Sequence, residues 1–178
     1  SSLKYFKKYT QAEKKDIVVL AELTLNDLSS DGEIDETDFL DRVDLLCSLG
    51  QTVLISNYPE HYKLSSYLHQ FTRKSEVAII IGTGNLKRLF EESYYENLNG
   101  GILEAFGKLF LGHAKILVYP SINENGDELV TCKNFKPAPH LQHLYDYLYQ
   151  NNFIEDIPKA NVNNLNIISD DVLDLIRK

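Results

Sequence analysis

The sequence predicts an α/β fold, a Rossmann-like three-layer sandwich with a mostly parallel sheet and a small hairpin at its edge. Short, β-branched apolar runs alternate along the chain with segments whose apolar residues recur at helical spacing. This order is typical of parallel strands joined by helical crossovers, and a later Asn-Gly step predicts the hairpin. The predicted parallel strands cover 16–25, 52–56, 77–81 and 115–119.

Length and composition favour one folded domain. A chain of 178 residues with 43% hydrophobic and 25% charged residues is close to the globular average, so we expect a packed core. We expect a lead-in segment over 1–15, the α/β domain over 16–155, and a C-terminal loop and helix over 156–178 that pack on the same domain. The Ser-Ser start without Met suggests one domain cut from a longer chain.

The first two elements differ in how clearly they are encoded. The run DIVVLAELTL at 16–25 opens with β-branched residues that favour a buried strand, although the spacing of its apolar residues would also suit a helix. At 37–49, apolar side chains recur at helical spacing, acidic residues favour the N-terminal turn, and Gly50 follows the last turn. The second segment is therefore predicted as a helix.

The centre of the chain repeats the strand and helix pattern. The run TVLIS at 52–56 is short and β-branched, as expected of an interior parallel strand, and Pro59 suits the first turn of a helix that runs to about Phe71. The run VAIII at 77–81 repeats the strand signature. The residues 82–85 are then expected to turn the chain into another helix.

In the last part of the chain, the sequence predicts two helices, a hairpin at the sheet edge and a terminal helix. Helical spacing predicts helices at 101–111 and at 140–150. The turn NENGD at 123–127 leads to a short strand near 129–131, and together they predict a hairpin at the sheet edge. The Asn-rich stretch 151–166 predicts a loop, after which Ser169, Asp170 and Asp171 cap a final helix to Arg177.

Charge and cysteine content narrow the expected partners. The net charge of -8 disfavours binding to a phosphate backbone, so we expect no nucleic-acid partner. No apolar run approaches the roughly 18 residues that span a bilayer, so we expect no membrane partner. Cys47 and Cys132 are too few for a disulfide framework, and we expect them to be buried thiols in the reducing cytoplasm.

Two segments that follow predicted strands carry candidate ligand-binding residues. Gly82 to Asn85 lies where backbone N–H groups can hold a phosphate or carboxylate, helped by Lys87 or Arg88, although a plain tight turn explains the same residues. Ser56 to Tyr58 also ends a strand, with His61 close behind, although an asparagine cap on the next helix is an alternative. The candidate ligand-binding residues are Ser56, Asn57, Tyr58, His61, Gly82, Thr83, Gly84, Asn85, Gly100, Gly101 and Glu104.

An acidic stretch of twelve residues, DLSSDGEIDETD at 27–38, lines up with a calcium-binding loop. Gly32 takes the turn position and Ile34 the apolar position, but Asp38 stands where the pattern has a long, bidentate Glu. An acidic loop that caps the following helix explains the same residues. The candidate calcium ligands are Asp27, Ser29, Asp31, Asp35 and Asp38.

Two features near the C-terminal end have structural explanations. His140 and His143 are three residues apart on one predicted helix, a spacing that can share a metal ion, but no recognised pattern of acidic residues or cysteines completes the set. We therefore expect surface histidines. The aromatic stripe between residues 145 and 153 is more often core or interface packing than a platform for stacking bases.

The helix, Gly50, strand and Asn57 over residues 39–81 resemble the middle of a haloacid-dehalogenase-like fold, in which a residue at the strand end contacts phosphate. Such enzymes carry an Asp-x-Asp on the first strand as nucleophile and acid. The first predicted strand of this chain offers only Glu22. The resemblance therefore implies a fold of this kind without its catalytic apparatus.

A second resemblance covers most of the chain from Asp31 to about Phe153. The stretches FLDRVDLLCSLGQTVLISNYPEHYKL (39–64), YYENLNGGILEAFGKLF (94–110) and KILVYPS (115–121) resemble the C-terminal region of a family of cytosolic bacterial proteins. Members are catalogued as nicotinate-nucleotide adenylyltransferase-like or as TonB-dependent receptors. The resemblance implies the C-terminal domain of a larger bacterial protein, and it assigns no catalytic residues to this chain.

These observations predict a non-catalytic or degenerate α/β domain that acts in assembly, regulation or ligand binding. Its expected partners are the rest of its own longer chain and a second copy, in a homodimer formed through the tyrosine-rich C-terminal helices. One alternative is a domain of nucleotide or NAD metabolism that binds a nucleotide or phosphorylated metabolite between Ser56–Tyr58 and Gly82–Asn85. The other is calcium binding at 27–38, and no motif identifies a cofactor or a catalytic residue.

Overall fold

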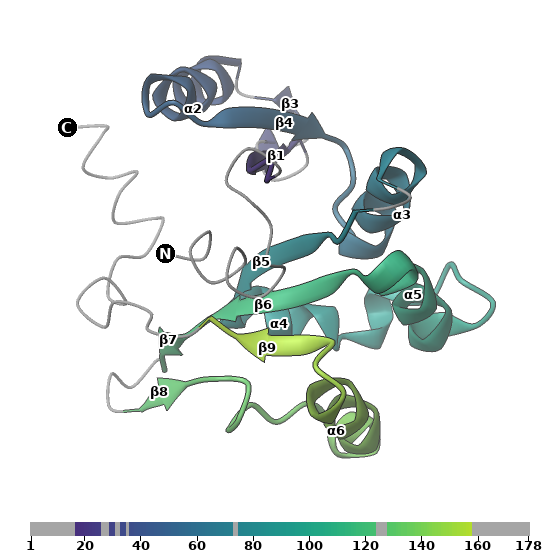
Figure 1. Cartoon of the computed structure of the whole chain (residues 1–178). Helices are drawn as coiled ribbons and strands as arrows, with labels where there is room; N and C mark the ends of the chain where they lie inside the picture. The colour runs from purple at the N-terminus through teal and green to yellow at the C-terminus, as the bar shows by residue number, and fades with distance from the viewer. Residues whose placement is uncertain are drawn as a thin grey trace.

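Parallel strands form the centre of the computed structural model, which describes residues 17–25, 29–30, 33–34, 36–72, 75–123 and 128–157 (Figure 1). One sheet pairs β1 (Leu20–Thr24) with β4 (Thr52–Ser56). The second sheet has the order β5 (Ala78–Gly82), β6 (Lys115–Tyr119), β9 (Ile154–Asp156). All these pairings are parallel, so the carboxyl ends of the strands in each sheet point the same way.

The two sheets follow one another in space in the order β4, β1, β5, β6, β9 (Figure 1). This is a doubly wound order, because the chain moves outward from β1 to β4 and then outward in the other direction from β5 to β9. Within the described residues, β1 and β5 do not pair with each other. The predicted α/β, Rossmann-like fold is confirmed.

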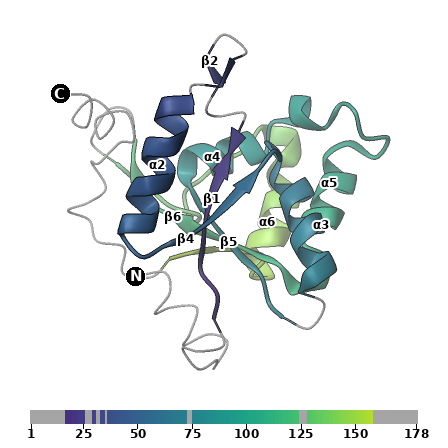
Figure 2. The same cartoon turned by 90° about the horizontal axis from the view of Figure 1, so that it is seen from above.

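Helices cover both sides of the strands. Figure 2 shows the strands between α2 on one side and α3 and α5 on the other. The helices are α2 (Glu36–Ser48), α3 (His61–Phe71), α4 (Thr83–Leu89), α5 (Gly101–Leu109) and α6 (Gln142–Gln150), with short 3-10 turns at Glu92–Tyr95, Leu111–His113 and Pro139–Leu141. Two small antiparallel hairpins pair β2 (Ser29–Ser30) with β3 (Glu33–Ile34), and β7 (Ser121–Ile122) with β8 (Leu129–Val130). The second hairpin is the predicted one.

The hydrophobic core lies between the second sheet and helices α3 to α6. Leu86, Ile116 and Ile154 are almost completely buried there. The ring of Phe90 packs edge-on against Phe106 at 5.1 Å between centroids, a geometry that aromatic pairs favour. The core residues come from four helices, three strands, two 3-10 turns and the segments between them, so this half of the molecule is held together as one unit.

The half formed by α2, β1 and β4 buries much less apolar surface. Helix α2 has no buried residue, although the helix predicted at 37–49 is present, shifted by one residue, and Gly50 follows it at φ +71°. The side chain of Val18 is 78% exposed and that of Ile55 is 48% exposed. The segment 16–25 therefore contains a strand rather than a helix, but the expectation that this strand is buried is wrong. Strand β4 pairs with β1 alone among the described strands, so it is an edge strand and not an interior one.

Three further local predictions differ from the structure. Residues 83–85 form no turn, because β5 passes at Gly82 directly into α4. The predicted loop 151–166 contains β9, which the apolar contacts of Ile154 with the core hold against β6. Cys132 is buried as expected, but Cys47 is exposed on the weakly covered helix α2. The predicted helix at 169–177 and the Asn-Gly step of the hairpin lie outside the described residues.

Substitutions of two leucines, one on α4 and one on α5, would test where the hydrophobic core lies. Leu86 on α4 is completely buried, whereas Leu103 on α5 is 67% exposed. We expect Leu86→Ala to lower the free energy of unfolding by about 2 to 5 kcal/mol, because it leaves a cavity among packed side chains. Leu103→Ala should change it by no more than about 0.5 kcal/mol. Urea unfolding followed by circular dichroism measures both, and equal losses would contradict the assigned core.

Candidate functional site

A cleft of about 1090 Å³ separates the two sheets. One wall is formed by β1 and the residues before it, and the other by β5. The rest of the lining comes from helices α3 and α4, the segment at Tyr94 and Tyr95, and single residues of α2, β4 and β6. Most of the wall is aliphatic, with side chains such as Leu20, Leu54 and Ile80. We name this space the β1–β5 cleft.

The inner edges of both strands face the β1–β5 cleft. Within the strands, the consecutive residues from Glu22 to Thr24 of β1 line it, and so do those from Ala78 to Ile81 of β5. Because successive side chains of a strand point to opposite faces, an unbroken run along a cavity means that the edge of the strand lies against it. Within the described residues, β1 bonds only to β4 and β5 only to β6, so both inner edges leave backbone N–H and C=O groups for water or a ligand.

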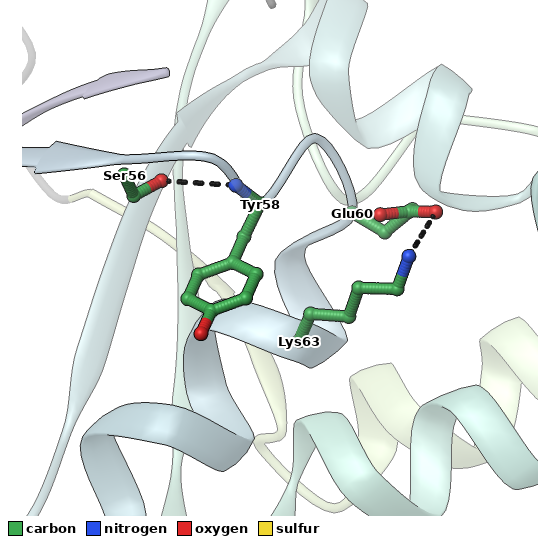
Figure 3. A network of polar contacts seen from close by, with 4 residues as sticks. All are labelled: Ser56, Tyr58, Glu60 and Lys63. Atoms are coloured by element: carbon green, nitrogen blue, oxygen red, sulfur yellow. Dashed lines mark hydrogen bonds and ion pairs between the residues drawn. The ribbon is translucent and has the colours of Figure 1, made fainter. Parts of the chain in front are cut away.

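Polar groups gather where β1 and β4 end. Glu22 on β1 accepts hydrogen bonds at one carboxylate oxygen, Oε1, from the Thr24 hydroxyl at 2.8 Å and from the Ser56 hydroxyl at 2.6 Å. The Ser56 hydroxyl in turn accepts the backbone N–H of Tyr58 at 3.2 Å (Figure 3). Glu22 and Thr24 line the cleft. This cluster, Glu22–Thr24–Ser56, ties the two strands together at the polar end of the cleft.

A second polar pair stands at the start of α3 (Figure 3). The Lys63 ammonium donates to Glu60 Oε1 at 2.8 Å, and this hydrogen bond raises the pKa of Lys63. The other oxygen, Glu60 Oε2, is buried and has no hydrogen-bond partner in the described part of the chain. Glu60 and His61 both line the cleft, so the first residues of α3 belong to its polar end.

Helix α4 supplies the opposite side of the polar end. Asn85 and Arg88 both line the cleft and are one helical turn apart on one side of the helix. The Arg88 Nε donates to the Tyr94 hydroxyl at 3.0 Å, and the centre of its guanidinium lies 5.3 Å from the centre of the Tyr94 ring. Arg88 is an exposed residue, and the ring and hydroxyl of Tyr94 orient its guanidinium.

The structure brings two of the sequence-predicted ligand residues into the β1–β5 cleft, His61 and Asn85. Thr83 is buried, and its hydroxyl is hydrogen-bonded to that of Ser121. Gly100 and Glu104 form the start of α5, where Gly100 N–H donates to Glu104 and the Lys108 ammonium holds the pKa of Glu104 below its usual range. The candidates that do not line the cleft are Ser56, Asn57, Tyr58, Gly82, Thr83, Gly84, Gly100, Gly101 and Glu104.

The possible metal ligands are only partly described. Asp27, Asp31 and Asp35 of the predicted calcium loop lie outside the described residues. Asp38 lies in α2 and forms an ion pair with Arg42 at 2.8 Å. No group of three metal-ligating side chains occurs among the residues that the structure describes. His140 is exposed, as predicted, and its Nε2 lies 2.5 Å from a Glu92 oxygen.

Sequence reasoning missed most of the polar groups that line the cleft. Glu22 drew attention only as an insufficient substitute for a catalytic Asp, and Glu60 and Tyr94 were not singled out. The available signal was the pair Glu22 and Thr24, two polar residues at alternate positions of an otherwise apolar strand. Such residues share one face of a strand and need partners there.

The comparisons with known proteins leave the site to be interpreted from its own geometry. No protein-family model matches the chain, and no curated protein or solved structure matches it significantly. In the described part of the chain, no helix is both long and apolar enough to cross a membrane.

The Glu22–Thr24–Ser56 cluster can be tested through stability. We expect Ser56→Ala to lower the free energy of unfolding by about 1 to 3 kcal/mol, because it removes one donor to Glu22 and leaves the Tyr58 N–H without its acceptor. Ser48→Ala is the matched control, because that exposed hydroxyl bonds only within α2. Thermal or urea unfolding measures both variants. Equal effects would show that the cluster adds nothing beyond an ordinary surface hydroxyl.

Proposed function

We propose that this chain is a ligand-binding α/β domain of a larger cytosolic bacterial protein, and that its ligand occupies the β1–β5 cleft. One observation carries the proposal. The strand order reverses between β1 and β5, and the cleft lies at that point. In open α/β sheets, the crevice at such a switch point is the preferred place for a small-molecule ligand.

The size and lining of the cleft support a small molecule. Its volume of about 1090 Å³ is near the upper end for ligand pockets, which are mostly apolar with a few placed polar groups. Here the aliphatic side chains of β1 and β5 form the body of the cleft. One set of polar groups, which includes Glu22, Glu60 and Arg88, lies near the carboxyl ends of the strands and the starts of α3 and α4, and a second set lies near the amino ends of β4 and β5 (Gln51, Thr72, Ser75 and Glu76). A nucleotide or phosphorylated metabolite, with a flat base or apolar part and a polar group, fits this division.

The surroundings of two potential nucleophiles, the Ser56 hydroxyl and the Cys132 thiol, favour ligand binding over catalysis. The Ser56 hydroxyl donates to a carboxylate and accepts a backbone N–H, so it is part of a structural network. Burial, followed by the nearby Asp156 charge, raises the pKa of the Cys132 thiol, which keeps it protonated and unreactive. These two groups serve the fold. The proposed activity is therefore recognition of a ligand.

Assembly has weaker support in the aromatic C-terminal helix. Tyr145 is buried and Tyr149 stacks on it at 6.1 Å between ring centroids, so both serve the interior. The side chain of Tyr147 is 58% exposed, and its ring centroid lies 6.2 Å from that of Phe153. A self-association surface at α6 would therefore depend mainly on one exposed tyrosine. The cleft, by contrast, is lined by many apolar and polar residues.

A tryptophan in the cleft would report on the ligand, because the chain contains no Trp. Leu20 lines the cleft, and Leu103 lies exposed on α5 outside it. We expect Leu20→Trp fluorescence to change saturably with a ligand from a panel of nucleotides, nicotinamide and phosphorylated metabolites. Leu103→Trp should not respond to the same compound. At about 100-fold excess over its dissociation constant, the ligand should stabilise the unmodified chain by about 2.7 kcal/mol.

The outcomes of this experiment distinguish a wrongly assigned binding site from a wrongly assigned function. A compound that stabilises the chain and changes both tryptophans, or only the one at 103, would place its site outside the cleft. A panel in which no compound stabilises the unmodified chain would argue against the ligand-binding proposal as stated. In that case an assembly role, tested by the oligomeric state of Tyr147→Ser, takes its place.

A further inference from the structure

Arg88 is placed on the wall of the β1–β5 cleft with part of its hydrogen-bonding capacity already used. Its Nε donates to the Tyr94 hydroxyl at 3.0 Å, and Tyr94 also lines the cleft. A guanidinium has five N–H groups in a rigid, planar arrangement. Because only Nε is committed, the two terminal nitrogens keep their donors for another acceptor.

The other charged groups of the cleft, apart from Glu76, already have ion-pair or hydrogen-bond partners, although Glu22 is bonded to neutral hydroxyls and keeps its negative charge. Arg42 forms an ion pair with Asp38, and Glu60 forms one with Lys63. Glu22 accepts two hydroxyl donors. Arg88, by contrast, has no carboxylate partner within the described residues, although it lies against the cleft. Glu76, which also lines the cleft, precedes β5 and so lies at the opposite end of that strand.

Asn85 adds a second donor on the same side. It precedes Arg88 by three residues on α4, a spacing that places two side chains next to each other, and both line the cleft. The side-chain amide of Asn85 offers two N–H groups. An oxyanion between the two residues would receive the paired, charge-assisted hydrogen bonds for which a guanidinium is suited.

We propose that the ligand of the β1–β5 cleft carries a phosphate or carboxylate group, that Arg88 and Asn85 bind this oxyanion, and that Tyr94 positions the Arg88 guanidinium. This inference rests on the proposed function, because the cleft holds the rest of the ligand. It adds the residues that bind the charged group of the ligand. Phosphate and carboxylate share the chemistry, so the test includes both.

The test is a calorimetric titration of the chain with adenosine monophosphate, inorganic phosphate and succinate, each added separately at the same ionic strength. We expect saturable binding of at least one of these anions and at least a tenfold loss of affinity in Arg88→Gln. Lys87→Gln is the matched control, because it removes the same charge from the neighbouring exposed position, which does not line the cleft. Its affinity should stay within about twofold of that of the unaltered chain. Stronger binding of succinate than of either phosphate compound would assign the site to carboxylates.

Tyr94→Phe tests the positioning step, because it keeps the ring and removes the hydroxyl that accepts from Arg88. It should weaken binding of the same anion, but have no further effect when Arg88 is already Gln. Equal effects in both backgrounds would show that Tyr94 does not act through Arg88.

Failure of the oxyanion proposal can be distinguished from failure of the ligand-binding proposal. If a neutral compound changes the Leu20→Trp signal and Arg88→Gln leaves its affinity unchanged, the cleft binds a ligand but the oxyanion proposal is wrong. The oxyanion proposal is equally wrong if Lys87→Gln loses as much affinity as Arg88→Gln, because the effect would then be one of net charge. If no compound of either kind binds, both proposals fail.

Discussion

The inner edges of β1 and β5, which pair with no other strand in the described part of the chain, are the constraint on which the rest of the structure depends. Each strand satisfies its backbone on one side, through β4 or β6, and leaves the other side to the cleft. An open edge at the centre of a sheet has to be hydrated or covered, because backbone groups cannot remain buried without partners. The aliphatic side chains of the same strands restrict water, so the cleft is suited to a molecule that has both apolar and hydrogen-bonding parts.

The two walls of the cleft differ in how firmly they are held. Strand β5 belongs to the core through Ile81, which is 5% exposed, whereas β1 pairs with β4, and helix α2, which packs on β4, has no buried residue. Local stability follows the number of buried apolar contacts, so the wall of β1 is the weaker one. Contacts with a ligand would add a larger share to the stability of that wall, and binding energy would be spent partly on fixing it. This difference connects the unequal packing of the two halves with the ligand-binding role that we propose.

Local sequence determined the individual elements better than their arrangement. The runs 52–56 and 115–119 were predicted with their observed bounds, because continuous β-branched residues fit little else. Strand β9 was missed, because three residues in an Asn-rich stretch become a strand only through pairing with β6 and burial of Ile154. The cleft depends on β1 and β5 facing each other without pairing, which is a long-range property. Position after a strand thus pointed to two residues that line the cleft, His61 and Asn85, but not to the other residues that surround them there.

The polar end of the cleft shows why net charge is a poor guide to a ligand. The chain carries a net charge of -8, which disfavours long-range attraction of anions. At close range, however, the acidic groups Glu22 and Glu60 are engaged by hydroxyls and by Lys63. Arg88 is engaged by a neutral phenol that orients it without cancelling its charge. An anion that reaches the cleft therefore meets an oriented cation, and the short range of that contact favours selectivity for shape and group over capture of anions in general.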